Sequence, residues 1–402
     1  MRKVPKLRFK EFSDEWEEKK LGDILEFKNG VNASKEQYGK GIKFINVLDI
    51  LNNDFITYDN IIGKVDIDNN TVEKYSVTYG DILFQRSSET REEVGMANVY
   101  LDKKNIATFG GFVIRGKKIG EYIPIFLNKL LKTNLARNEI TSKSGGSTRY
   151  NVGQETLKDV RLLFPILQEQ EKIANFLTNI DKKISLTEKK LELFREYKKG
   201  VMQKIFSQEL RFKDSNGNDY PEWEEKTLGN YINFLTGYPF NSKKFNEEKR
   251  GVPLIRIRNL LDSNISTYYE GEYENKYIIK REDILIGMDG DFNVVKWKNN
   301  GALLNQRIVK VFSKNNLELC NTFLYYILEK PIKNINLKTF STTVKHLSVK
   351  DIEKIIVNLP ILKEQEKIAN FLSDIDNKIE NIEKELEGLK EFKKGLLQQM
   401  FV

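Results

Sequence analysis

One 42-residue segment occurs twice in the chain, and this repeat constrains the fold more than any other feature. Residues 165–206 and 360–401 are identical at 26 of 42 positions without a gap, at an offset of 195 residues. A segment repeated this closely is expected to fold in the same way in both places. The repeat therefore predicts a chain made of two related halves.

A second, shorter repeat precedes each of these segments. Residues 15–19 (Glu-Trp-Glu-Glu-Lys) reappear at 222–226, an offset of 207, so the segment that follows is 12 residues longer in the first half. Between the two repeats the halves share little beyond short echoes, such as Asp-Ile-Leu at 81–83 and at 283–285. Each half thus combines a repeated frame with a globular middle that has diverged.

The 42-residue segments predict two long helices that pair with each other. In both copies, steps between apolar positions alternate between four and three residues, which is the pattern of a coiled-coil seam. Each helix would be ~60 Å long. Two equal seams can bury each other, which favours an antiparallel pair over two helices that each pack only on their own domain. The predicted seam consists of Ile173, Leu177, Ile180, Ile184, Leu191, Ile368, Leu372, Ile375, Ile379 and Leu386.

These patterns predict an α+β fold with a pseudo-two-fold internal repeat, in which two globular domains are separated by two long helices that form an antiparallel coiled coil. The expected parts are a first domain at 1–160, a first helix at 161–206, a linker at 207–221, a second domain at 222–356 and a second helix at 357–402. β-rich runs predict strands near 42–47, 81–84, 254–258 and 307–311. Helices are expected over 122–135 and 319–332.

Composition excludes several kinds of site. The single cysteine, Cys320, excludes an internal disulfide and a multi-thiolate metal centre, and the single histidine, His346, excludes an HExxH zinc site. No apolar run approaches the ~18 residues of a membrane span, and no signal peptide is visible, so a cytoplasmic protein is expected. The net charge of +8 is compatible with a polyanionic partner without identifying one.

No motif in the sequence predicts catalysis. Residues 111–117 match the glycine and lysine spacing of a phosphate-binding loop, but Lys118 stands where Ser or Thr is required, and the Phe-Val-Ile interior favours a strand. The Asn-Pro-Pro-Tyr type of motif found in adenine methyltransferases is absent, and so is a glycine-rich S-adenosylmethionine loop. His346 has no partner motif, which favours a surface or DNA-facing residue over a general base. Neither catalytic residues nor metal ligands are predicted.

Polar and basic loops of both middles offer groups that bind DNA. Arginine pairs with guanine edges and asparagine or glutamine with adenine edges, whereas lysine, serine and threonine serve phosphates. For any one of these residues, an ordinary solvated loop position is the alternative. The candidates are Gln85, Arg86, Ser87, Arg91, Lys143, Ser144, Ser147, Thr148, Arg149, Arg256, Arg258, Asn259, Gln306, Arg307, Lys338, Thr342, Thr343 and Lys345.

The arrangement of motifs resembles a known family over essentially the whole chain. Each half begins with Trp-Glu-x-x-x-Leu-Gly and ends in a helix that starts Pro-Ile-Leu-x-Glu-Gln-Glu-Lys-Ile-Ala, at 165–174 and at 360–369. This resembles the specificity subunit of type I restriction–modification systems. The first copy departs from the family pattern only at Phe164, where the second copy has Leu359.

The resemblance implies a function. Each domain would read one half of a bipartite, asymmetric DNA site, and the helices would set the spacer. Two methyltransferase subunits and two ATP-dependent restriction or translocase subunits would supply the chemistry, with S-adenosylmethionine, ATP and Mg²⁺ on those partners and no cofactor on this chain. This chain would therefore not be an enzyme.

Two other classes of protein remain as alternatives. A coiled-coil structural scaffold with protein-binding terminal domains would show no salt-sensitive DNA binding, and it leaves two divergent basic domains unexplained. A self-sufficient restriction enzyme is disfavoured by the missing catalytic motifs.

Overall fold

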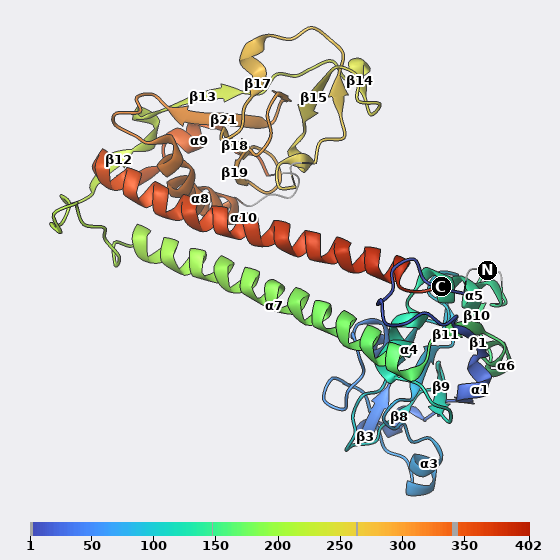
Figure 1. Ribbon diagram of the computed structural model, residues 1–402. Helices are drawn as coiled ribbons and strands as arrows, with labels where there is room; N and C mark the ends of the chain where they lie inside the picture. The colour runs from blue at the N-terminus through green and yellow to red at the C-terminus, as the bar shows by residue number, and fades with distance from the viewer. Residues whose placement is uncertain (1–2, 147, 263, 340–344) are drawn as a thin grey trace. The chain divides into compact units, whose positions relative to one another are not determined.

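The computed structural model describes residues 3–146, 148–262, 264–339 and 345–402 (Figure 1). The chain divides into two compact units. The first unit contains residues 1–189 together with 383–402, and the second contains residues 190–382. Each unit therefore holds one globular domain, part of the long helix that follows it, and part of the long helix of the other half.

The first domain is built on an antiparallel four-stranded sheet in the order β2-β9-β5-β7, beside a three-stranded sheet β4-β3-β8 and the pairs β1-β11 and β10-β6. Its strands are β1 (Glu17–Lys20), β2 (Leu25–Asn29), β3 (Tyr38–Ile45), β4 (Lys64–Val65), β5 (Ile82–Gln85), β6 (Ser87–Ser88), β7 (Ala97–Val99), β8 (Thr108–Phe109), β9 (Val113–Lys118), β10 (Tyr150–Asn151) and β11 (Arg161–Phe164). Its helices are α1 (Leu21–Ile24), α2 (Val47–Leu51), α3 (Asn69–Lys74), α4 (Pro124–Leu131), α5 (Asn134–Ser142) and α6 (Gln154–Lys158).

The second domain repeats this plan with a four-stranded sheet β13-β21-β18-β19, a five-stranded sheet β14-β16-β15-β20-β17 and the pair β12-β22. Its strands are β12 (Glu224–Thr227), β13 (Ile232–Thr236), β14 (Phe245–Asn246), β15 (Val252–Ile255), β16 (Tyr268–Tyr269), β17 (Ile278–Ile279), β18 (Ile284–Gly287), β19 (Val294–Lys296), β20 (Ala302–Leu304), β21 (Ile308–Ser313) and β22 (Ile356–Leu359). Its helices are α8 (Asn321–Lys338) and α9 (Val349–Glu353).

The repeated Asp-Ile-Leu motif is the start of the central strand of each domain. Successive side chains of a strand point to opposite faces. In β5, Ile82 and Phe84 enter the core that packs against the long helix, whereas Leu83 enters a separate core on the other face. In β18, Ile284 and Leu285 divide between two cores in the same way. One strand therefore separates two apolar layers, which explains why it is buried along its whole length.

A short antiparallel ladder closes each domain. β1 pairs with β11, with Glu17 opposite Phe164, and β12 pairs with β22, with Glu224 opposite Leu359. The chain thus enters and leaves each domain at one place. The ladders extend the domains a few residues beyond the predicted ends at 160 and 356. The single helix predicted over 122–135 is wrong, because the chain forms two helices there, α4 and α5, with a break at 132–133. The helix predicted over 319–332 begins at Asn321 and runs on to Lys338.

The two long helices are α7 (Leu167–Phe206) and α10 (Leu362–Gln399). Asp181 of α7 pairs with Lys393 of α10 at 2.6 Å, and Lys198 of α7 pairs with Asp376 of α10 at 2.7 Å. The residue of α10 in each ion pair comes earlier in the sequence as the residue of α7 comes later, so the two helices pair antiparallel. All ten predicted seam residues are buried or half-buried, as a seam between the two helices requires.

One charged cluster lies inside the helix pair of the first unit. Asp181, 11% exposed, accepts hydrogen bonds from Lys129 of α4 and from Lys393. Burial alone would raise the pKa of Asp181, but the hydrogen bonds from these two ammonium groups outweigh it, and the pKa lies below its usual value. The carboxylate therefore links the domain to both helices as an ion.

Replacing Asp181 with Asn should destabilise the chain by about 3 kcal/mol at neutral pH, because it leaves two lysines without an anion in a buried setting. The measurement is denaturant unfolding of the full chain, with the exposed Asp374→Asn on α10 as matched control. The difference should be complete above the usual carboxyl pKa and should be lost as pH falls through the lowered pKa of Asp181. Equal stability of both variants at neutral pH would contradict this role.

Candidate nucleic-acid interface

The same hydrogen-bonded platform occurs at one end of the central strand in each domain. In the first domain, Arg86 N donates to Phe112 O at 2.9 Å, and β6 pairs with β10 so that Ser87 lies opposite Asn151. In the second domain, Met288 N donates to Arg307 O at 2.9 Å, and Asp289 is bridged to His346. The platform is therefore made by backbone contacts that do not depend on which side chains it carries.

A close approach of two turns holds this platform in place. Gly30 N donates to Val113 O at 3.1 Å, and Gly237 N donates to Ile308 O at 2.9 Å. A Cβ at Gly30 would lie 2.1 Å from Gly110 O, and one at Gly237 would lie 1.9 Å from Asn305 O. Only glycine permits this contact. This explains why Gly30 and Gly237, each three residues after a phenylalanine (Phe27 and Phe234), occur at the same place in both halves.

The platforms differ in their side chains. In the first domain, Ser87 Oγ donates to Asn151 Oδ1 at 2.5 Å, and Phe112 is 67% exposed. In the second domain, Asp289 pairs with Arg307 and lies 2.7 Å from His346 Nδ1. Burial raises the pKa of Asp289, but hydrogen bonds from His346 and Arg307 outweigh it and lower the pKa below its usual value. The first platform carries the guanidinium of Arg86, which donates to Gly111 O at 3.4 Å, whereas the second presents a guanidinium beside a carboxylate.

Most predicted DNA-facing residues lie on the surface. The exposed ones are Arg86, Arg91, Lys143, Thr148, Arg149, Arg256, Arg258, Gln306, Arg307 and Lys338. Half-exposed are Ser87, Ser144 and Lys345, and the ammonium group of Lys345 donates to Asn336 O at 2.9 Å. Ser147, Thr342 and Thr343 lie outside the described residues.

The side chains of two predicted DNA contacts are buried and serve the fold. Gln85 is 5% exposed and donates to Ser87 O, and Asn259 is 5% exposed and donates to Asn264 O. An amide that bonds its own backbone is not available to a base edge. We therefore withdraw both residues from the proposed interface.

The repeated Glu-Gln of the helix motif anchors each domain to its long helix, a role that sequence reasoning missed. Glu169, which is fully buried, accepts two hydrogen bonds from Arg8, and Glu364 accepts from Arg211 in the same way. Gln170 Oε1 accepts from Ile123 N at 3.0 Å, and Gln365 Oε1 accepts from Cys320 N at 2.9 Å. These contacts explain why the frame is repeated.

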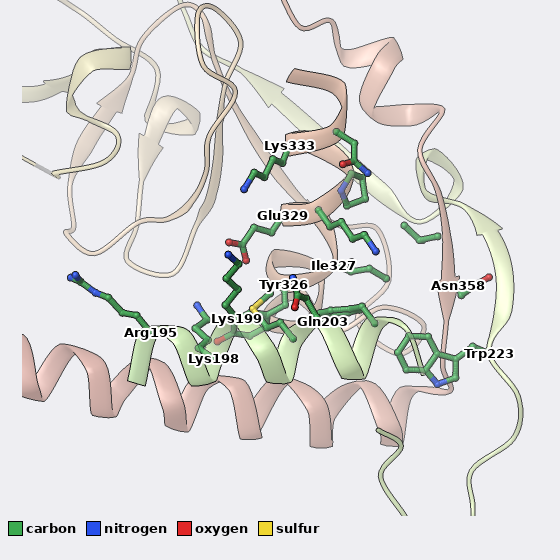
Figure 2. A pocket seen from close by; sticks show the side chains of 16 residues that line it. Arg195, Lys198, Lys199, Gln203, Trp223, Tyr326, Ile327, Glu329, Lys333 and Asn358 are labelled. Carbon is green, nitrogen blue, oxygen red and sulfur yellow. The ribbon is translucent and has the colours of Figure 1, made fainter. Parts of the chain in front are cut away.

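A groove lies beside the long helices in each unit. In the second unit, the end of α7 and the helix α8 line a groove of 510 Å³ (Figure 2). Its floor includes Phe206 and Trp223, and Lys199 and Lys330 are exposed on its rim. In the first unit, the end of α10 and the turn between α4 and α5 line a groove of 450 Å³. Its lining residues 390, 393, 394, 397 and 398 occupy the repeat positions of 195, 198, 199, 202 and 203.

Burial affects a lysine of the first groove. It lowers the pKa of Lys132 to about 8, and repulsion from Lys129 contributes in the same direction. Among the described residues there is no cluster of three or more His, Cys, Asp or Glu that could hold a metal ion. None of the helices within the described residues combines the length and apolarity that a bilayer span requires.

Two domains of one fold, each anchored to a long helix and each presenting different side chains on one platform, define an internally repeated two-domain protein. Comparison with known proteins gives the family. The model of the type I restriction modification DNA specificity domain matches residues 13–193 and again 220–391. The chain belongs to this family and carries two copies of its domain.

Relatives agree with this assignment, and a solved structure shares the fold. The chain is 29% identical to a putative type I restriction enzyme MjaX specificity subunit from Methanocaldococcus jannaschii, over 96% of this chain and 93% of that protein. It is 37% identical to the EcoBI specificity subunit of Escherichia coli over 48% of this chain, a match that spans only 41% of the relative. A crystal structure of the S subunit from M. genitalium shares the fold, with a TM-score of 0.61, 19% identity and 99% coverage of both chains.

Proposed function

We propose that this chain is the DNA-reading subunit of a type I restriction–modification complex, in which each domain reads one half of a bipartite, asymmetric site and the helices set the spacer. The observation that carries the proposal is the platform at the end of the central strand. The same backbone contacts present Ser87, Phe112 and Asn151 in one domain and Asp289, Arg307 and His346 in the other. Two domains that share a backbone framework and differ in the side chains they present suit two different half-sites.

The chemistry would belong to partners. We propose that two methyltransferase subunits and two ATP-dependent restriction or translocase subunits join this chain, bringing S-adenosylmethionine, ATP and Mg²⁺, and that this chain is not catalytic and binds no cofactor. The family match supports this division of labour. An assembly that acts on cellular and invading DNA belongs in the cytoplasm, and we include that location in the proposal.

The experiment is to express the chain with its methyltransferase partner and to sequence the methylated positions of the host DNA. The expected result is one bipartite motif, with binding of the purified complex to that motif weakening steeply as salt rises. Salt-insensitive binding or the absence of any motif would favour the rival scaffold, whose terminal domains bind protein.

The repeated grooves are our candidate for methyltransferase docking. A twofold-repeated surface suits two identical partners, and the basic rims suit an acidic segment of each partner. The double variant Lys199→Glu, Lys330→Glu reverses the charge of one rim and should weaken methyltransferase association by at least about tenfold, because opposed charges govern encounter and specificity. The measurement is the affinity of the purified subunits.

The control for this charge reversal is Lys204→Glu, an exposed position near the end of α7 outside the groove lining. It should leave association unchanged. Equal affinity of the double variant and the control would rule out the groove as a docking site.

A further inference from the structure

We propose that the turn before the strand that pairs with the central strand, at Phe112 before β9 in the first domain and at Arg307 before β21 in the second, determines one base pair of each half-site. This inference rests on the proposed function and deepens it. The two positions are equivalent by their contacts. Phe112 O accepts from Arg86 N, Arg307 O accepts from Met288 N, and the next residue begins β9 or β21.

The side chains of Phe112 and Arg307 are both exposed, and this exposure does not contribute to the packing of the domains. Phe112 is 67% exposed, in a turn between two strands that are otherwise buried, and Arg307 is 63% exposed. Single exposed apolar side chains are common on protein surfaces. Phe112 is therefore a candidate because it occupies the position of Arg307, and its exposure leaves it accessible to a partner.

Arg307 carries a second sign of function in its backbone. Its φ is 69°, in the left-handed region that side chains other than glycine rarely adopt. The ion pair with Asp289 does not explain this conformation, since an ion pair of an exposed guanidinium stabilises a protein little. Gln208, Lys249 and Glu282 also have a positive φ, so this conformation is a sign of binding only together with the exposed side chain of Arg307.

The side chains next to Arg307 orient its guanidinium group. Asp289 is only 10% exposed and also contacts His346, so the carboxylate that holds the guanidinium is itself fixed. A positioned, solvent-facing guanidinium matches the O6 and N7 acceptors of guanine. We therefore assign a guanine to the base pair that Arg307 faces.

The first platform supplies a different chemistry at the equivalent place. Ser87 and Asn151 are hydrogen-bonded to each other, and the guanidinium of Arg86 donates to Gly111 O beside Phe112. The neighbours of Phe112 therefore differ in charge from the carboxylate that Arg307 contacts. An exposed aromatic ring in the major groove makes apolar contact with the methyl group of thymine. We assign a thymine to the base pair that Phe112 faces.

The test uses the complex with the methyltransferase partner, and compares binding to the wild-type site with binding to duplexes that carry one substituted base pair. Arg307→Gly should reduce discrimination at one G·C pair by about 10-fold to 100-fold. Phe112→Ala should reduce discrimination at one A·T pair in the opposite half. Arg307→Gly should not lower the melting temperature, because glycine adopts a positive φ without strain.

Arg281→Gly is the matched control. Arg281 is 59% exposed, pairs with Glu282 and precedes the opposite end of β18, so this variant removes the same charge elsewhere. It should leave discrimination unchanged at every position. A loss confined to overall affinity in Arg307→Gly, or changes in the same half for Arg307→Gly and Phe112→Ala, would overturn the inference while leaving the proposed function intact. A wild-type complex without any sequence preference would overturn the proposed function itself.

Discussion

Replacing residues 17–164 with the corresponding domain of another family member is expected to change one half of the methylated site completely and to leave the other half unchanged. The physical reason is the ladder between β1 and β11, where the domain enters and leaves at one place. An exchange cut at these strands carries the whole platform with it. Methylome sequencing of cells that express the chimera with the methyltransferase partner measures the outcome.

An internal control is available because the chain contains a second domain on the same frame. Placing a copy of residues 224–359 at 17–164 should give a site whose two halves contain the same bases. A chimera in which both halves differ from the parent motif would contradict independent reading by the two domains.

A second large effect is expected from the length of the helices. Inserting one heptad after Lys189 in α7 and one after Lys384 in α10 should lengthen the spacer by about three base pairs, since seven helical residues add ~10 Å and one base pair spans ~3.4 Å. A heptad keeps the seam on the same face of each helix. The spacer is read from the methylome of the variant.

The control for this insertion is four residues after Lys189 in α7 alone. This change shifts the following seam residues, including Leu191, out of register with α10, so assembly with the partner should be lost. An unchanged spacer in the paired-heptad variant would show that the helices do not set it.

The parts of the fold that follow a period could be predicted from the sequence. Five heptads of alternating steps specify the seam, and the repeated Asp-Ile-Leu marks the central strand because that strand must be apolar on both faces. The interface was harder to predict. Gln85 and Asn259 have the right chemistry for adenine, yet the same amides satisfy the backbone beside them, and the sequence does not distinguish these uses.

The platform escaped prediction because distant segments build it. Ser87 and Asn151 are 64 residues apart in the sequence and meet through a two-residue ladder that no periodicity announces. Phe112 lies at the edge of a strand-like run and resembles a core residue. A signal did exist, since the offset of 195 that aligns the 42-residue repeats also places Phe112 opposite Arg307. Aligning the halves through the frame would have shown this position to be variable.

The makeup of the first unit has a consequence for how the protein is made. Phe401 packs against Trp16 and Phe126, with ring centroids 6.2 Å and 5.6 Å apart, and Leu7 N donates to Gln399 O. The core of the first unit therefore cannot be completed until residues 383–402 have been synthesised. The second unit needs only residues 190–382. During synthesis the domain translated second can finish folding first. A nascent chain truncated before residue 396 would leave the core of its earliest domain open.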